Sequence, residues 1–167
     1  FLERVLCDEA GGWQDQIAAS YGGLNRINFN ASGYELLPVI ISPKRKEQLK
    51  SNLLMFFTGF VRFSSEVQRE NASSCSDKNS LLREMRSLVD DAECLLTDST
   101  KDLDDFGRLL DCTWRLKRQT GKSVSMDNID ILYEKGMNAG ALGGKLLGAG
   151  GGGFFIFYVQ PEKQNAV

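Results

Sequence analysis

Residues 147–159 read LGAGGGGFFIFYV, in which a glycine-rich loop runs directly into an apolar, aromatic segment. Aromatic and β-branched residues favour strands, so FFIFYV predicts a buried strand. Apolar residues recur at helical spacing over 81–96 and over 103–118, which predicts two amphipathic helices. These elements do not alternate regularly as they would in a doubly wound sheet. The sequence therefore predicts an α+β two-layer sandwich, an antiparallel sheet with helices on one face.

The rest of the chain predicts shorter elements. Turn residues NASG separate two segments in which apolar and polar residues alternate, a pattern typical of a hairpin. Asp127 is expected to be the N-cap of a following helix. The glycine-rich loop is expected to connect that helix directly to the final strand. The other expected elements are helices over 14–21, from Pro43 and after Gly59, and strands over 24–29, 33–42 and 53–59.

The glycine-rich loop, residues 148–153, contains five glycines in six positions. It matches the dinucleotide pattern G-x-G-x-x-G, but that pattern requires a strand before it and a helix after it. A Walker loop is excluded because Leu146 follows Lys145 where Ser or Thr is required. Such backbone can point amide N–H groups at an anion, and Lys145 could neutralise a phosphate. The alternative is a tight connection that needs glycine only to relieve crowding, but five glycines exceed that need.

A second candidate lies in GGWQDQIAAS, residues 11–20, where Asp15 follows a glycine pair at the start of a predicted helix. A carboxylate in this position commonly does no more than interact favourably with the helix dipole. The functional alternative is that Asp15 accepts the proton of a substrate hydroxyl while a phosphoryl group is transferred to that hydroxyl. This reaction depends mostly on positioning and charge neutralisation, so a single Asp suffices as the base.

Composition narrows the classes of function. The chain has 20 Lys and Arg against 22 Asp and Glu, so no charge excess favours binding to nucleic acid or to an anionic membrane. It has no histidine, which excludes catalytic triads and imidazole bases within this sequence. The 4 cysteines show no C-x-x-C spacing, and no apolar run approaches the roughly 20 residues of a membrane span. We therefore expect a cytoplasmic enzyme without a metal site built from its own residues.

Several segments resemble the GHMP small-molecule kinases, the superfamily of galactokinase, homoserine kinase and mevalonate kinase. GGWQDQ resembles the catalytic-aspartate segment of its sugar kinases, and GGKLLGAGGGGFFIFY is similar to its third, C-terminal glycine motif. LLMFFTGFVRFSSEVQREN, WRLKRQ and IDILYEKGMNAGALGGKLLGAGGGGF are most similar to D-glycero-D-manno-heptose 7-phosphate kinases, with L-fucose kinases next. The resemblance extends over residues 11–159.

The resemblance implies ATP-dependent phosphoryl transfer, with Mg²⁺, to the anomeric hydroxyl of a sugar or sugar phosphate. Asp15 would then be the catalytic aspartate. The pocket for the sugar would be shaped by Gly11, Gly12 and Gln16. Arg62 and Ser64 would contact a substrate phosphate near a helix N-terminus, although a surface salt bridge explains Arg62 equally well. The glycine motif near the phosphates would comprise Gly148, Ala149, Gly150, Gly151, Gly152 and Gly153.

In such kinases two earlier motifs, one of them the serine-rich loop around the ATP phosphates, lie upstream of the segments matched here. The resemblance therefore implies that residues 1–42 end an N-terminal kinase domain and that residues 43–167 form the C-terminal, ferredoxin-like domain. ATP and Mg²⁺ would bind mostly in the remaining N-terminal half, so the fragment is expected to be inactive alone. The alternative function is a non-catalytic α+β binding module, in which the acidic run DSTKDLDDF would be the surface that contacts a partner. The other interpretation of this run is a solvated loop and the start of a helix.

Overall fold

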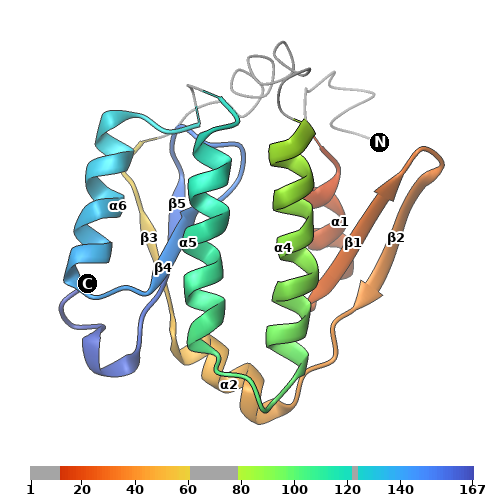
Figure 1. Cartoon of the computed structure of the whole chain (residues 1–167), viewed down its shortest axis with the longest axis horizontal. Helices are drawn as coiled ribbons and strands as arrows, with labels where there is room; N and C mark the ends of the chain where they lie inside the picture. Colours follow the sequence, from red (N-terminus) through yellow and green to blue (C-terminus); the bar gives the residue numbers. More distant parts are fainter. Residues whose placement is uncertain (1–11, 61–78, 122–123) are drawn as a thin grey trace.

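The computed structural model describes residues 12–60, 79–121 and 124–167, and Figure 1 shows their arrangement. The helix expected after Gly59 lies outside these residues. The elements, in chain order, are α1 (Gln14–Tyr21), β1 (Asn25–Asn30), β2 (Gly33–Pro38), α2 (Pro43–Ser51), β3 (Leu53–Phe57), α4 (Asn79–Thr97), α5 (Asp104–Arg118), α6 (Asp127–Ala139), β4 (Gly143–Leu146), β5 (Phe154–Tyr158) and a short 3₁₀ turn (Pro161–Lys163).

Two separate antiparallel sheets are present in the described residues. One has the strand order β3-β5-β4, so the aromatic strand β5 is central, with Leu54 opposite Phe157 and Leu146 opposite Phe155. The other is the β1–β2 hairpin. The predicted α+β class, with helices packed on an antiparallel sheet, is confirmed. Hereafter β3, β4, β5, α5 and α6 are called the sandwich, and residues 12–42 the α1–hairpin segment.

The core of the sandwich follows from alternation along β5. Phe155 and Phe157 share one face of the strand, where they pack against Trp114 of α5 and Tyr133 of α6. Tyr158 points to the opposite face and joins a second cluster with Leu49, Leu96 and Leu103. Each buried aromatic side chain removes a large apolar area from water, so these two clusters supply most of the hydrophobic stabilisation of the sandwich.

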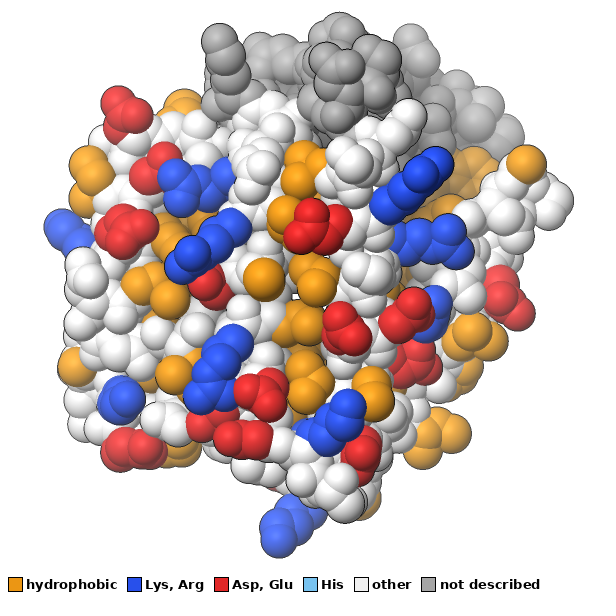
Figure 2. Space-filling view, viewed as in Figure 1, with side chains coloured by type: hydrophobic (Ala, Val, Ile, Leu, Met, Phe, Trp, Pro, Cys, Tyr) orange, Lys and Arg blue, Asp and Glu red, His pale blue; other side chains and the backbone are white. Residues whose placement is uncertain are grey.

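Helices α4 and α5 lie side by side and confirm the predicted amphipathic helices. Figure 2 shows a strip of hydrophobic side chains between them, with charged groups on both sides. The acidic run between these helices forms a turn and a helix start: Asp98 accepts hydrogen bonds from Thr100, and Asp102 accepts one from the N–H of Asp104. These local hydrogen bonds explain the acidic run, and no binding partner is needed to explain it.

Strand β4 corrects the expectation that the glycine-rich loop follows a helix directly. Gly143 and Gly144 have low strand propensity, so the sequence pattern did not predict a strand here. The packing explains the glycines, since a Cβ at Gly143 would overlap the carbonyl oxygen of Gly107 in α5. The loop therefore joins two antiparallel strands. No helix follows it, so the context required for dinucleotide binding is still absent.

Several element boundaries also differ from expectation, among them the end of β3 at Phe57 instead of residue 59. β2 ends at Pro38 instead of residue 42, at the position paired with Asn25, the first residue of β1. Helix α6 begins at Asp127, with Met126 in the N-cap position and no side-chain cap. Ser125 instead donates a hydrogen bond to Asp130 in the first turn, at 2.5 Å.

None of the helices in the described residues combines the length and apolar character needed to cross a membrane.

Candidate functional site

The structure brings together the two segments that sequence reasoning singled out. Asp15 lies in the first turn of α1, and Gly148 begins the glycine-rich loop after β4. Lys117, in the last turn of α5, connects them: its Nζ donates a hydrogen bond to the carbonyl oxygen of Gly148, and its ammonium interacts electrostatically with Asp15. Lys145 of β4 acts on the same ammonium. The site therefore contains one carboxylate, two lysines and a glycine-rich loop.

The two lysines are in an unfavourable environment for charge. Burial and, to a smaller extent, the positive charge of Lys145 lower the pKa of Lys117 to about 8, while Asp15 acts in the opposite direction. Burial also lowers the pKa of Lys145. Desolvation and like charge both disfavour an ammonium, so the folded protein holds these two cations together at a free-energy cost. Such a cost is more common at functional sites than elsewhere.

Asp15 itself is exposed and does not cap its helix. The N-cap position is occupied by Trp13, whose side chain makes no capping hydrogen bond. Among the described residues, no donor forms a hydrogen bond with the Asp15 carboxylate. A carboxylate at this place still interacts favourably with the helix dipole. Its oxygens also remain available to accept a proton from a substrate hydroxyl.

Part of the glycine-rich loop packs closely against the protein's own backbone. All five of its glycines have positive φ, and the N–H groups of Gly151 and Gly153 donate to Val124 O at 3.0 Å and Phe60 O at 2.9 Å. A Cβ at Gly150 would lie 2.8 Å from the Val124 backbone. Close packing against the protein's own backbone thus explains part of the glycine content.

The remainder of the loop is open. Nothing lies within 4 Å of where a Cβ on Gly148 would be. Within the described part of the chain, the amide N–H groups of Gly148, Ala149, Gly150 and Gly152 donate to no acceptor. Successive amides in a loop with positive φ form a concave donor surface suited to an anion. Lys117 contacts this same open end at Gly148.

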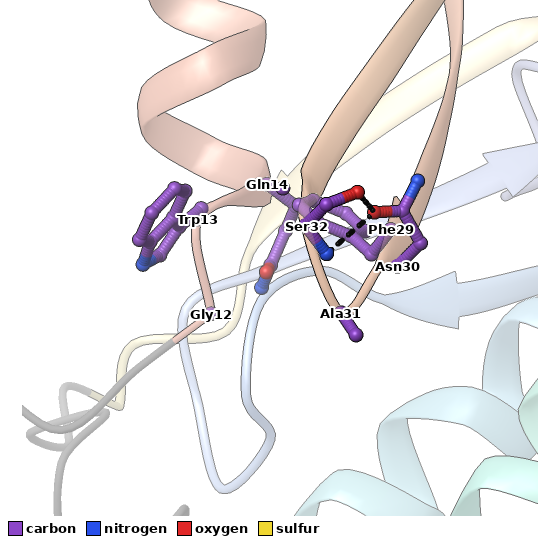
Figure 3. Close-up of a pocket in the computed structure, with 8 residues that line it drawn as sticks. Gly12, Trp13, Gln14, Phe29, Asn30, Ala31 and Ser32 are labelled. Atoms are coloured by element: carbon purple, nitrogen blue, oxygen red, sulfur yellow. Dashed lines mark hydrogen bonds between the residues drawn. The ribbon is translucent and has the colours of Figure 1, made fainter.

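An open cavity of about 450 Å³ lies between the start of α1 and the tip of the β1–β2 hairpin. It is lined by Gly12, Trp13, Gln14 and residues 29–33, and Figure 3 shows Gln14 between Trp13 and the hairpin tip. Asn30 closes the tip by accepting hydrogen bonds from the N–H and hydroxyl of Ser32. Small-molecule pockets commonly combine aromatic side chains with a few polar groups such as amides, and this cavity offers both.

The predicted pocket residues are only partly brought together. Gly12 lines the cavity, whereas Gln16 is half-buried and is not among its described lining residues. Gly11, Arg62 and Ser64 lie outside the described residues. Sequence reasoning missed Lys117, because WRLKRQ is a helix end in which one lysine among several basic residues has no distinguishing pattern. In the described ranges, no group of three or more acidic or cysteine side chains could hold a metal ion.

This arrangement suits one type of chemistry. An exposed carboxylate can accept a proton, while two ammonium groups and a row of amides can neutralise negative charge on a phosphoryl group. Phosphoryl transfer requires this combination of a base and a site that stabilises anionic oxygens.

Comparison with known proteins agrees with this chemistry. Residues 91–167 match the family "GHMP kinases C terminal". The chain is 31% identical over 172 residues to D-glycero-alpha-D-manno-heptose 7-phosphate kinase of Campylobacter jejuni, covering 98% of this chain and 48% of that protein. It is 30% identical over 173 residues to the bifunctional fucokinase/GDP-fucose pyrophosphorylase of Arabidopsis thaliana, covering 98% of this chain and 16% of that protein.

Among solved structures, the mevalonate kinase of L. major in complex with R-mevalonate has the same fold, with a TM-score of 0.71 and 22% identity over 91% of this chain and 45% of that one. The chain thus spans about half the length of the heptose 7-phosphate kinase and of the mevalonate kinase. From these findings we conclude that residues 91–167 form a domain of the family "GHMP kinases C terminal".

Proposed function

We propose that the protein is part of a sugar kinase that transfers a phosphoryl group from ATP to the anomeric hydroxyl of a sugar or sugar phosphate. One observation carries this proposal: Asp15 and the glycine-rich loop, far apart in the sequence, both interact with Lys117, the loop through a hydrogen bond at Gly148 and Asp15 electrostatically. A helix-stabilising carboxylate has no reason to lie beside the lysines of an anion site. A base for the attacking hydroxyl does, because the hydroxyl and the transferred phosphoryl group must be adjacent.

In this proposal Asp15 accepts the proton of the sugar hydroxyl. The open amides of the glycine-rich loop face the phosphate oxygens, and the lysine ammonium groups balance their charge. ATP supplies the phosphoryl group and Mg²⁺ neutralises its charge. We place most of their binding site in an N-terminal half upstream of this chain, because the described residues offer only one wall of it. Residues 1–42 would close the N-terminal domain, and residues 43–167 would form the C-terminal one.

D-glycero-D-manno-heptose 7-phosphate is the acceptor we favour, because the similarity to the Campylobacter jejuni kinase covers nearly the whole chain. Gly11, Gly12 and Gln16 would surround the sugar, and Arg62 and Ser64 would contact its phosphate. L-fucose is the alternative acceptor, supported by the Arabidopsis thaliana relative at nearly equal identity. A cytoplasmic location is part of the proposal, in keeping with the free thiols of Cys94 and Cys112.

A non-catalytic binding module is the competing proposal. It needs neither the carboxylate of Asp15 nor two partly buried lysines, and the acidic run proposed as its partner surface is explained by local turns. The kinase proposal also predicts that this chain alone has no activity.

The test is an assay of the protein with its upstream half, supplied with ATP, Mg²⁺ and a panel of sugars that includes heptose 7-phosphate and L-fucose. Asp15→Asn should lower kcat on the order of a hundredfold or more, as expected for loss of a general base. Asp127→Asn is the matched control, since Asp127 is another exposed first-turn aspartate, in α6. Equal activity of both variants would assign Asp15 to the helix dipole. Absence of transfer to every sugar would support the binding module.

A further inference from the structure

We propose that Lys117 and Lys145 act as a pair that binds a phosphoryl group at the open end of the glycine-rich loop, and that the protonation of Lys117 controls this binding. This inference rests on the proposed function, which requires a phosphate at this place. It goes further by assigning the residues that hold the phosphate and by predicting how binding depends on pH.

The two lysines lie on different elements, and Lys117 contacts the loop at Gly148. Lys117 lies in the last turn of α5, and Lys145 lies in β4, opposite Ile156 of β5 and two residues before the loop residue Leu147. Both elements belong to the sandwich, in which a Cβ on Gly143 of β4 has no room beside α5. The backbone positions from which the two lysine side chains extend are therefore fixed by packed elements and not by flexible loops. A rigid frame of this kind lowers the cost of ordering a binding site.

The charges around Lys117 are unbalanced. Of the described residues, Lys145 on β4 and Asp15 on α1 are the charged groups that act on it. Two ammonium groups and one carboxylate leave an excess of one positive charge in a partly desolvated place. Burial penalises both cations, and each repels the other. A phosphate dianion would reverse that penalty, because an opposite charge at short range favours the protonated form of both lysines.

The loop supplies the complementary donors. Lys117 donates one hydrogen bond to the carbonyl oxygen of Gly148, and an ammonium has further N–H donors for a ligand. The amides of Gly148, Ala149, Gly150 and Gly152 have no acceptor within the described residues and begin at this same point. Lysine acts as a point charge toward phosphate, and adjacent amides supply the directional hydrogen bonds.

The pH dependence follows from Lys117. In the absence of ligand its pKa is about 8, so the ammonium loses its proton in the mildly alkaline range. A phosphate binds the protonated form more tightly, and its affinity must therefore fall as the pH rises above about 8. Arginine in the same place remains protonated throughout this range. Lys117→Arg should consequently bind phosphate near neutral pH and lose the part of the alkaline decline that Lys117 causes.

The experiment is a titration with inorganic phosphate, followed by NMR, of the protein with its upstream half and without any sugar. The dissociation constants of the wild type, Lys117→Met, Lys145→Met and Lys117→Arg are compared between pH 7 and 9.5. Lys50→Met is the matched control: Lys50 is exposed and pairs with Glu47 in α2, at the end of the sheet opposite the loop. Phosphate itself changes charge in this pH range. The ratio of the wild-type dissociation constant to that of Lys117→Arg at each pH removes this contribution, because it affects both proteins equally.

We expect Lys117→Met and Lys145→Met each to weaken phosphate binding about tenfold or more at pH 7, and Lys50→Met to leave it unchanged. Between pH 8 and 9.5 the affinity of the wild type should fall about tenfold, as expected for loss of one proton per site, whereas that of Lys117→Arg should fall much less. The inference is overturned if both methionine variants bind phosphate like the wild type. It is also overturned if Lys117→Arg shows the same alkaline decline as the wild type.

The outcome is separable from that of the kinase assay. Sugar phosphorylation together with lysine-independent phosphate binding would leave the proposed function intact and refute the lysine pair. Lysine-dependent phosphate binding without transfer to any sugar would refute the kinase and leave the pair.

Discussion

The sandwich and the α1–hairpin segment differ in what holds them in place. In the sandwich, Trp114 and Tyr158 are fully buried, and every ring of the main aromatic cluster has a partner ring. In the α1–hairpin segment, all of which is described, Ile17 is the only buried residue. Trp13, Tyr21 and Phe29 are 46%, 59% and 52% exposed. A stable packed unit thus lies beside a segment with little core of its own.

The candidate site takes one part from each region. Lys117, Lys145 and the glycine-rich loop belong to the packed sandwich, whereas Asp15 belongs to the α1–hairpin segment. Arg26 of β1 links the α1–hairpin segment to α4 through ion pairs with Asp90, at 2.6 Å, and Glu93, at 2.7 Å, and α4 in turn packs against α5 of the sandwich. The comparison teaches that the proposed anion site is rigidly built, while the position of the proposed base depends on weaker contacts.

The largest expected effect is in the core of the sandwich. In the chain of residues 1–167, Trp114→Ala should lower the free energy of unfolding by about 3 to 5 kcal/mol, because it leaves a cavity between Tyr133 and Phe155. Trp13→Ala should lower it by less than about 1 kcal/mol, as is usual for exposed positions. Urea unfolding of both variants measures the difference. Equal losses would show that the α1–hairpin segment is as tightly packed as the sandwich.

A second pair of variants compares glycines in the two regions. Gly143→Ala should lower the free energy of unfolding by about 3 kcal/mol, because its Cβ would overlap the carbonyl oxygen of Gly107. Gly33, at the hairpin tip, has a φ of 141° and no atom within 4 Å of a Cβ, so Gly33→Ala should cost only about 1 kcal/mol of backbone strain. Thermal unfolding with both variants tests this. A harmless Gly143→Ala would mean that α5 and β4 can move apart.

Lys117→Met should stabilise the protein at neutral pH. The pKa of Lys117 is about 8 in the folded protein against an ordinary value of 10.5, so the protonated form is penalised by folding. That penalty is complete below pH 8, declines as the pH rises from 8 to 10.5 and is absent above. Removing the charge should therefore add about 1 kcal/mol at pH 7, after allowance for solvent screening, and nothing near pH 10.5. Urea midpoints at pH 7, 9 and 10.5 measure it; a loss of stability at pH 7 would indicate a structural lysine.

The smallest expected effect concerns the link between the two regions. Arg26→Ala removes ion pairs whose acidic partners are exposed to solvent, and salt screens such pairs. We expect a small decrease of the urea midpoint at low ionic strength that disappears in about 1 M NaCl. A large decrease that persists in salt would show that Arg26 has a packing role, and that the α1–hairpin segment is held more firmly than its exposed side chains indicate.

Local patterns were sufficient to predict most elements. Apolar spacing placed the helices over 81–96 and 103–118, and NASG placed the hairpin turn. Helical and strand periods repeat within a few residues, so neighbours in the sequence carry this information. Strand β4 was missed because glycine is unusual in a strand. The glycine at position 143 is needed because a Cβ there would overlap the carbonyl oxygen of Gly107, and no local sequence pattern shows this contact between distant segments.

The sequence by itself determined that a carboxylate at Asp15 and a glycine-rich loop at residues 148–153 are candidates for one site, because both motifs are read from adjacent residues. Only the tertiary structure decided that Lys117 joins them, since its side chain gains significance from Gly148, Lys145 and Asp15 on three other segments. The same applies to the purpose of each glycine. The sequence shows that the loop glycines have no side chains. Only the neighbouring backbone decides whether the space that a side chain would occupy is filled by the protein, as at Gly150, or left open, as at Gly148.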